Sequence, residues 1–204
     1  MIYQCYNHIM KSCSYIIREA QYNDCYLVDC GDFNKTTRIL ETYSIQPKGI
    51  FLTHCHFDHI YGINELLSLF PECKIYGSKE TLEGLYNAKI NLSFYQGNPF
   101  IISSEAMVIP ISSTSKIDIL GEPLHIFETP GHDIGCLSYQ YKNNLFTGDS
   151  YIPFAPVFTK WKRSDKEIAK QQEQKLKNYA ESHNLHILCG HYRKHSIFRL
   201  DISC

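Results

Sequence analysis

Three histidines and one aspartate lie within six consecutive residues, directly after a short apolar run. The motif is His54-x-His56-x-Asp58-His59, and the preceding run, Gly49–Leu52, has the pattern of a buried strand. Alternate side chains of an extended segment point to the same side, so His54 and His56 can share one metal ion. A bend after them can bring Asp58 and His59 towards a second ion. The fold must therefore end a buried strand at this motif.

A chance cluster of surface histidines is a poor explanation for this motif. Even in a chain that is about 5% histidine, the pattern is expected by chance on the order of once in a thousand such sequences. Imidazole and carboxylate ligands suit zinc, iron or manganese. Cys55 stands between two of the histidines, but alternation points it to the opposite side, which favours a core thiol.

Three further segments each place a histidine or an aspartate next to a glycine after a predicted strand. They are Gly131-His132, Gly148-Asp149 and Gly190-His191. Each signal is weak alone, because such turns are common. Loops that follow strands gather at one edge of a β scaffold, where metal ligands are usually mounted. We therefore expect His132, Asp149 and His191 to meet the histidine motif.

The chain begins with a series of predicted strands. Aromatic and β-branched residues predict strands over Tyr3–Asn7, Cys13–Arg18 and Asp24–Asp29. Asn34 can cap a helix over about 35–43. These elements lead into the strand that precedes the histidine motif.

A long helix and an irregular segment stand out further along. Residues 164–183 contain no glycine or proline, and Ser164, Asp165 and Glu167 form a capping pattern at their start. Residues 86–100 contain three asparagines, a glycine and a proline, which makes them a candidate loop or lid. The order of strands and helices fits two β-sheets covered by helices on their outer faces.

The composition is that of one globular domain, which we expect to span residues 1–204. The chain is 44% hydrophobic and 20% charged, and its net charge of -1 gives no sign of a nucleic-acid or membrane partner. The N-terminus lacks the pattern of a secretory signal. The nine cysteines form no C-x-x-C pair, and we expect reduced thiols in a cytoplasmic protein.

The order of these segments resembles the metallo-β-lactamase superfamily over nearly the whole chain. The resemblance rests on Val28-Asp29-Cys30-Gly31, the histidine motif and the three glycine-containing segments. It implies an α/β fold of the αββα sandwich type, in which two mixed β-sheets pack face to face with helices on the outer faces. It also implies two metal ions, the first held by His54, His56 and His132, the second by Asp58, His59 and His191, with Asp149 bridging both.

Within the superfamily the chain is more similar to the hydroxyacylglutathione hydrolases, or glyoxalase II enzymes, than to antibiotic-degrading β-lactamases. The bridging Asp149 and the Asp58-His59 pair carry this similarity. The few residues after His191 leave no room for the C-terminal helical extension that helps those thioesterases to bind glutathione, so we do not expect glutathione as the substrate. The resemblance implies a small-molecule ester, thioester, lactone or phosphoester, with zinc as the expected metal and iron or manganese as alternatives.

The expected chemistry is attack by a metal-bridging hydroxide. Two adjacent cations lower the pKa of a shared water and polarise the scissile group. Asp58 can orient this hydroxide and take up its proton. An aromatic stretch from Tyr151 to Trp161 follows Asp149 and can form a wall of the cleft. The substrate-binding candidates are Tyr151, Lys160, Lys162 and Arg163, and the alternative is a packed crossover with solvated charges.

Other functions remain open at the level of sequence. A mononuclear iron persulfide dioxygenase would use His54, His132 and Asp149, and the segments around these two histidines resemble that family too. A nuclease is disfavoured by the near-neutral charge, and a non-catalytic metal-binding protein by the seven intact ligand positions.

Asp29 can either position a histidine or end its strand. The sequence does not indicate the oligomeric state. Five histidines lack motif context, and we expect surface or structural roles for His8, His125, His183, His186 and His195.

Overall fold

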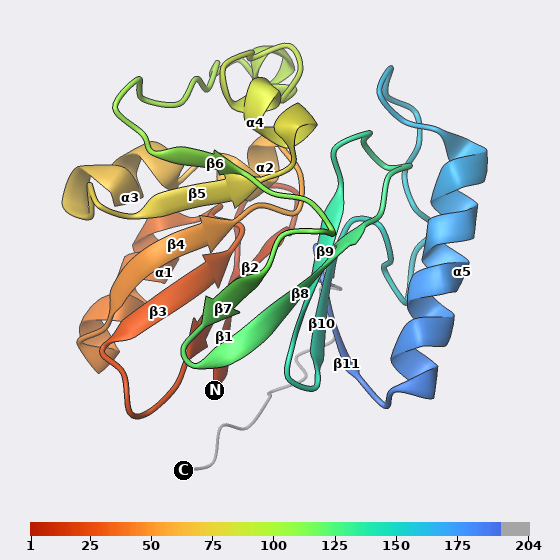
Figure 1. The fold of residues 1–204 in the computed structure, drawn as a ribbon. Coiled ribbons are helices and arrows are strands. Elements are labelled where there is room, and N and C mark those ends of the chain that lie inside the picture. The colour runs from red at the N-terminus through yellow and green to blue at the C-terminus, as the bar shows by residue number, and fades with distance from the viewer. Residues whose placement is uncertain (193–204) are drawn as a thin grey trace.

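The computed structural model of the protein describes residues 1–192 and consists of two mixed β-sheets that pack face to face (Figure 1). The first sheet is antiparallel from β1 to β3 and parallel from β3 to β6. Its strands, in spatial order, are β1 (Ile2–Tyr6), β2 (Cys13–Arg18), β3 (Asp24–Val28), β4 (Gln46–Phe51), β5 (Lys74–Gly77) and β6 (Val108–Pro110).

The second sheet is built mainly from antiparallel hairpins. Its strands, in spatial order, are β11 (His186–Cys189), β10 (Asn144–Gly148), β9 (Leu137–Tyr141), β8 (Glu122–Glu128) and β7 (Ile117–Ile119). Only β10 and β11 run parallel, because the chain crosses over through a helix between them. Glycine at position 121, with a φ of 81°, closes the β7–β8 turn.

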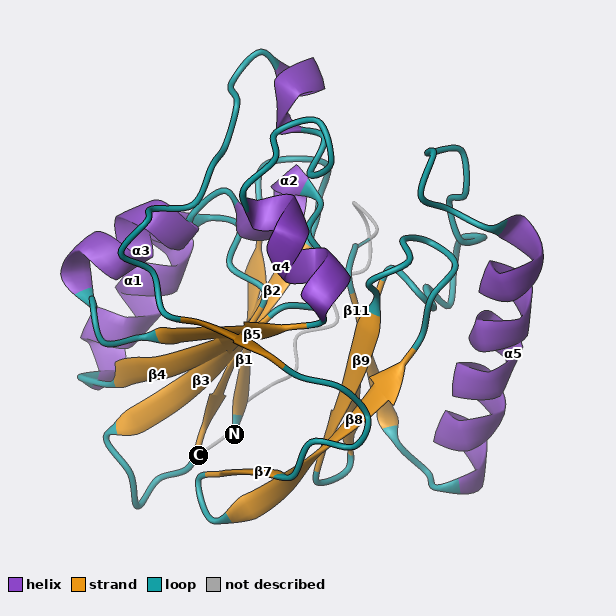
Figure 2. Ribbon diagram, turned by 45° about the horizontal axis from the view of Figure 1, so that its top comes forward, coloured by secondary structure: helices purple, strands orange, loops and turns teal. Residues whose placement is uncertain are grey.

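Helices cover the outer face of each sheet, as Figures 1 and 2 show. On the first sheet lie α1 and α3, and α5 covers the second. The helices are α1 (Phe33–Tyr43), α2 (Phe57–Ile60), α3 (Ile63–Leu69), α4 (Lys79–Leu85) and α5 (Lys166–Ser182), with a 3₁₀ turn, η1 (Ser93–Gln96). The predicted αββα sandwich is confirmed.

Alternation along the strands builds the core on both sides of the first sheet. On β2, Tyr15 and Ile17 point into the layer between the sheets, whereas Ile16 points to the helices. Phe51 at the end of β4 contacts Tyr139 of β9, with ring centroids 5.6 Å apart. This contact between the sheets holds the end of β4, from which the histidine motif continues, against the second sheet.

Local contacts shift several predicted element boundaries. Asp32, not Asn34, caps α1, because its carboxylate accepts the backbone N–H of Lys35. Asp165 caps α5 in the same way, so this helix begins two residues into its predicted range. A break at Gly62 separates α2 from α3, where a Cβ would lie 2.4 Å from the carbonyl oxygen of residue 31. Among residues 1–192, no helix is long and apolar enough to cross a membrane.

Candidate metal centre

Strand ends bring the seven predicted ligands to one edge of the sandwich. His54 follows β4, His132 lies in the loop between β8 and β9, Asp149 follows β10 and His191 follows β11. Within the described chain, the candidate ligand atoms form three overlapping groups, and the atoms of each group lie within 4.8 Å of one another. The groups are His54, His56 and His132; His54, His59 and Asp149; and Asp58, His59 and His191.

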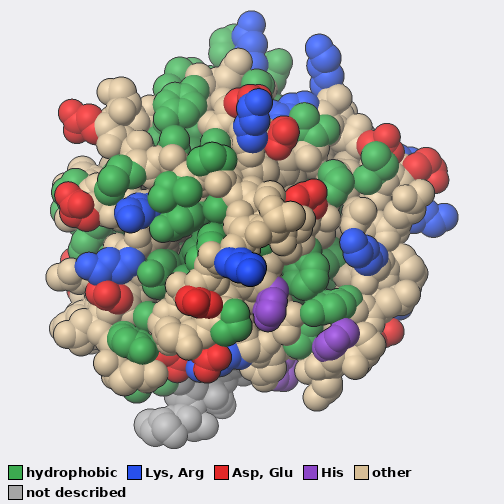
Figure 3. All heavy atoms as spheres, viewed as in Figure 1, with side chains coloured by type: hydrophobic (Ala, Val, Ile, Leu, Met, Phe, Trp, Pro, Cys, Tyr) green, Lys and Arg blue, Asp and Glu red, His purple; other side chains and the backbone are tan. Residues whose placement is uncertain are grey.

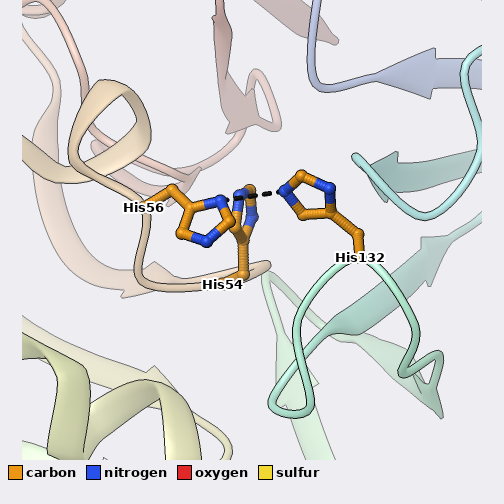
Figure 4. A group of neighbouring side chains, drawn as sticks. All are labelled: His54, His56 and His132. Carbon is orange, nitrogen blue, oxygen red and sulfur yellow. Dashed lines mark hydrogen bonds between the residues drawn. The ribbon is translucent and has the colours of Figure 1, made fainter. Parts of the chain in front are cut away.

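The first group consists of three buried imidazoles that face a common point (Figure 4). Their ring centroids are 4.6 Å apart for His54 and His56, 4.9 Å for His54 and His132, and 4.7 Å for His56 and His132. Nε2 of His132 lies 2.9 Å from Nδ1 of His56. His54 and His56 come from one side and His132 from the opposite sheet, so the group forms only when both sheets are packed.

Asp149 connects the first group to the second. One of its oxygens lies 3.4 Å from Nε2 of His132 and 3.1 Å from Nε2 of His191, and the other lies 3.5 Å from Nε2 of His59. Asp58 completes the second group, with an oxygen 3.4 Å from Nε2 of His59 and 3.5 Å from Nε2 of His191. The carboxylate of Asp149 therefore faces histidines of both groups.

Hydrogen bonds on the far side of four rings fix their orientation. In each of these histidines Nδ1 is the donor, so the neutral ring carries no hydrogen on Nε2, and Nε2 is directed into the group. The bonds are 2.8 to 3.0 Å long and join His132 to the carbonyl of Phe158, His191 to the carbonyl of Met10, His59 to the carboxylate of Asp29 and His54 to the hydroxyl of Thr53. This arrangement is the one that imidazole ligands of metals adopt.

Asp29 has a positioning role in this network. Its carboxylate accepts hydrogen bonds from the backbone N–H and the hydroxyl of Thr53 and from Nδ1 of His59. The residue adopts a left-handed backbone conformation with a φ of 59°, which is uncommon for residues other than glycine. Of the two roles that the sequence left open, the contacts favour orientation of a histidine.

Three buried polar atoms in the centre have no hydrogen-bond partner among the described residues. They are Nε2 of His54, Nε2 of His59 and Oδ1 of Asp149. A buried polar atom that lacks a partner costs free energy, so such atoms are rare in native proteins. These three belong to one candidate group, and their nitrogen and oxygen donors suit divalent transition metals. The residues therefore fit metal ions as their missing partners.

Burial and charge set the ionisation that ligands need. Burial lowers the pKa of His54 and His56 well below the ordinary value, and neighbouring imidazoles add to the shift. Both rings are therefore neutral and offer a lone pair. Burial works against ionisation of Asp149, but His191, His59 and His132 outweigh it and hold its pKa well below the usual range. Asp149 is thus a carboxylate.

His59 behaves in the opposite way. Burial lowers its pKa, but Asp58 and Asp149 outweigh this effect and raise the pKa to about 10. The protonated ring therefore offsets part of the charge of the two carboxylates, and a metal ion bound at Nε2 would take the place of that proton. Burial raises the pKa of Asp58, and repulsion from Asp149 adds to the shift.

The profile of the metallo-beta-lactamase superfamily matches residues 11–191. The chain belongs to this superfamily. A curated relative, the hydroxyacylglutathione hydrolase of Buchnera aphidicola subsp. Baizongia pistaciae (strain Bp), is 34% identical over 127 residues, which make up 62% of this chain and 43% of the relative. The same enzyme of Salmonella typhi is 31% identical over 126 residues, 62% of this chain and 42% of the relative. The chain thus spans less than half the length of these relatives.

Solved structures of the superfamily share the fold. BLEG-1, a B3 metallo-beta-lactamase, superimposes with a TM-score of 0.82 at 22% identity over 95% of this chain and 92% of that protein. TTHA1623, solved in a di-iron-bound form, gives a TM-score of 0.79 at 18% identity over 94% of this chain and 92% of that protein. The predicted resemblance to the superfamily is confirmed.

In this member of the superfamily, an apolar pocket of about 300 Å³ opens beside the candidate ligands. Five of its lining residues are candidate ligands, namely His56, Asp58, His132, Asp149 and His191. Most of the others are apolar: Met10, Phe57, Leu92, Ile152, Phe154, Ala155, Pro156, Phe158 and Trp161. The segment after Asp149 thus forms one wall, and Leu92 and Gln96 of the 86–100 segment also line the pocket.

The four predicted substrate-binding residues lie in different places. Tyr151 packs beside α5 with Leu176 and Ala180 and does not line the pocket, because its side chain turns to the outer face of the second sheet. Lys160 is exposed and lines neither this pocket nor the adjoining one. Lys162 lines the adjoining pocket.

Arg163 lines the adjoining pocket, and an ion pair holds it there. Its guanidinium pairs with Asp133 at 3.0 Å and donates to the carbonyl of Glu80. Asp133 is buried, and its second oxygen has no hydrogen-bond partner in the described chain and lies 4.0 Å from Nε2 of His56. Asp133 therefore lies near Nε2 of His56, on the side of the ring that faces away from His132. Its position next to His132 was the only sequence signal for it.

The residues set aside at the sequence level lie away from the centre. The thiol of Cys55 is buried and faces α4, where a Cβ on Gly84 would approach it to 2.4 Å. Four histidines are exposed: His8, His125, His183 and His186. His195 lies outside the described residues.

Proposed function

We propose that this chain is a hydrolase that uses two divalent metal ions to cleave a small ester, thioester, lactone or phosphoester. One observation carries the proposal: seven residues with nitrogen or oxygen ligand atoms form overlapping groups beside an apolar pocket, and Asp149 faces histidines of the first and the last of these groups. A single tetrahedral site needs only three or four protein ligands. Zinc is the metal we propose, and the same donors suit iron or manganese.

The proposed ligands divide between the two ions. The first would be held by His54, His56 and His132, the second by Asp58, His59 and His191, and Asp149 would contact both. Metal ions in such a site supply a hydroxide nucleophile near neutral pH and polarise the group under attack.

Asp58 is the proposed proton acceptor. It lines the pocket, so its carboxylate can reach a water molecule that attacks the substrate. Burial raises its pKa, which makes the carboxylate a better base. Phe57 and Ile152 line the same pocket and exclude bulk water from it.

A small-molecule substrate and a cytoplasmic location complete the proposal. The net charge is -1, and Figure 3 shows basic and acidic side chains interspersed on one face of the molecule. This surface gives no support for a nucleic-acid partner. The sequence identity of 31% to 34% with hydroxyacylglutathione hydrolases favours thioesters among the four substrate classes.

Metal removal tests the proposal. Protein dialysed against a chelator should lose hydrolysis of a panel of esters, thioesters and phosphodiesters, and added zinc should restore it, because the nucleophile depends on the metals. Hydrolysis that survives complete metal removal would contradict the proposal. So would a single bound iron together with oxygen consumption on a persulfide.

A further inference from the structure

A second pocket adjoins the pocket beside the metal centre. It measures about 390 Å³ and is lined by residues of the 86–100 segment and by the chain that precedes α5. Three residues line both pockets, namely His56, Leu92 and Trp161. The two pockets therefore form one cleft, and a proposed metal ligand, His56, lies at their junction. A molecule that occupies both pockets must pass the metal centre.

The two ends of this cleft differ in charge. The second pocket contains Lys89, Lys162 and the Arg163–Asp133 ion pair, in which the charges cancel. Neither Lys89 nor Lys162 has an ion-pair partner among residues 1–192, and Lys89 lies 5.4 Å from the ring centroid of Phe94. Two positive charges that are not neutralised within the described chain thus flank the second pocket, where they attract an anion.

The pocket beside the metal centre has an exposed aromatic wall. Phe158 is 47% exposed and Trp161 is 39% exposed, with ring centroids 5.8 Å apart. Exposed apolar side chains that gather at a cleft mark a binding surface for apolar groups. The carbonyl of Phe158 accepts the 2.8 Å hydrogen bond from His132. This bond fixes the wall relative to the proposed metal ligands.

We infer that the substrate carries an apolar chain on one side of its scissile bond and an anionic group, a carboxylate or a phosphate, on the other. The inference rests on the proposed hydrolase function. The apolar chain lies against Phe158 and Trp161, and the anion lies between Lys89 and Lys162. Water adds to the carbonyl carbon, the carbon–sulfur or carbon–oxygen bond breaks, and the leaving sulfur or oxygen ends with the proton of that water.

Binding of ketone analogues tests the inference without requiring turnover. In 5-oxododecanoate, a methylene replaces the sulfur of the thioester S-octanoyl-3-mercaptopropionate, so the analogue cannot be hydrolysed. The zinc-loaded protein should bind it at least about tenfold more tightly than the neutral 5-oxododecanamide, because two lysines face the carboxylate. It should also bind it at least about tenfold more tightly than 5-oxohexanoate, which lacks most of the apolar chain. Calorimetry measures the three dissociation constants.

Variants assign each preference to its end of the cleft. The double variant Lys89→Ala/Lys162→Ala should lose the preference for the acid over the amide. Phe158→Ala keeps the backbone carbonyl that holds His132 and should lower the preference for the long chain over the short one. Lys170→Ala/Lys175→Ala removes the same charge from exposed positions of α5 outside both pockets and should change neither preference.

Two failures are distinguishable. Equal binding of the acid and the amide, or an unchanged preference in Lys89→Ala/Lys162→Ala, would overturn the inference even in an active hydrolase. Selective binding of 5-oxododecanoate with no hydrolysis of S-octanoyl-3-mercaptopropionate would instead contradict the proposed function, and the bound class of molecule would then not be a substrate.

Discussion

At His56, the imidazole is turned the other way from its neighbours. In the group of His54, His56 and His132, His56 points Nδ1 inward, whereas His132 points Nε2 inward. Nε2 of His56 is therefore left on the far side, where the unpartnered oxygen of Asp133 lies 4.0 Å away. This distance is longer than a hydrogen bond, so the contact is electrostatic. Arg163 holds the other oxygen and fixes the carboxylate.

Asp133→Asn tests this positioning role. The substitution removes the charge behind His56, and partners of metal-bound imidazoles contribute about 10- to 100-fold to metal affinity. Because the 4.0 Å contact is longer than a hydrogen bond, we expect zinc affinity to fall by about tenfold, the lower end of that range, as measured by competition with a chelator. The control is Asp118→Asn, at an exposed position of β7. Unchanged affinity in Asp133→Asn, with the fold intact by unfolding midpoint, would show that Asp133 acts only on packing.

At the scale of elements, α5 supports the loop that carries His132. The carbonyl of Gly131 accepts the backbone N–H of Asp165, and the hydroxyl of Ser164 donates to the carbonyl of His132. The loop approaches the helix so closely that a Cβ on Gly131 would lie 2.4 Å from the Cα of Ala169. The backbone at Gly131 has a φ of 134°, a conformation that favours glycine.

Gly131→Ala should therefore loosen both the helix and the metal centre. We expect a loss of at least about 2 kcal/mol in the free energy of unfolding, since backbone strain and overpacking each cost about 1–3 kcal/mol. Urea unfolding measures this loss. The matched control is Gly97→Ala, where φ is 76° but no atom lies within 4 Å of the added Cβ. That variant keeps the strain without the clash, so an equal loss in both would show that the contact with α5 is unimportant.

At the scale of the whole molecule, local patterns in the sequence predicted the individual elements best. Aromatic and β-branched residues in β2 and the apolar run before His54 predicted the strands, and ligands at strand ends predicted the edge at which they meet. Contacts between distant segments could not be predicted in this way. Arg163 lines the cleft, but its guanidinium is paired with Asp133, 30 residues away in sequence.

The 86–100 segment shows the same limit. Its irregular sequence predicted a loop or lid, but it did not indicate which residues, among them Lys89 and Leu92, line the cleft. Tyr151 illustrates the converse, because its place two residues after Asp149 suggested a cleft residue. The outer face of the second sheet offers Tyr151 an apolar neighbourhood under α5, and there it packs. Proximity along the chain to a ligand is thus a poor guide to which face a side chain takes.

The metal content of the wild type and of Asp149→Asn tests the two-metal centre most directly. Asparagine keeps the shape but removes the charge, and its amide nitrogen is a donor that cannot bridge two cations. Elemental analysis should give about two metal ions per wild-type chain, as the seven ligands require, and fewer in Asp149→Asn, whereas Asp118→Asn should keep the wild-type content. One metal ion per wild-type chain, or two in Asp149→Asn, would contradict a centre held together by Asp149.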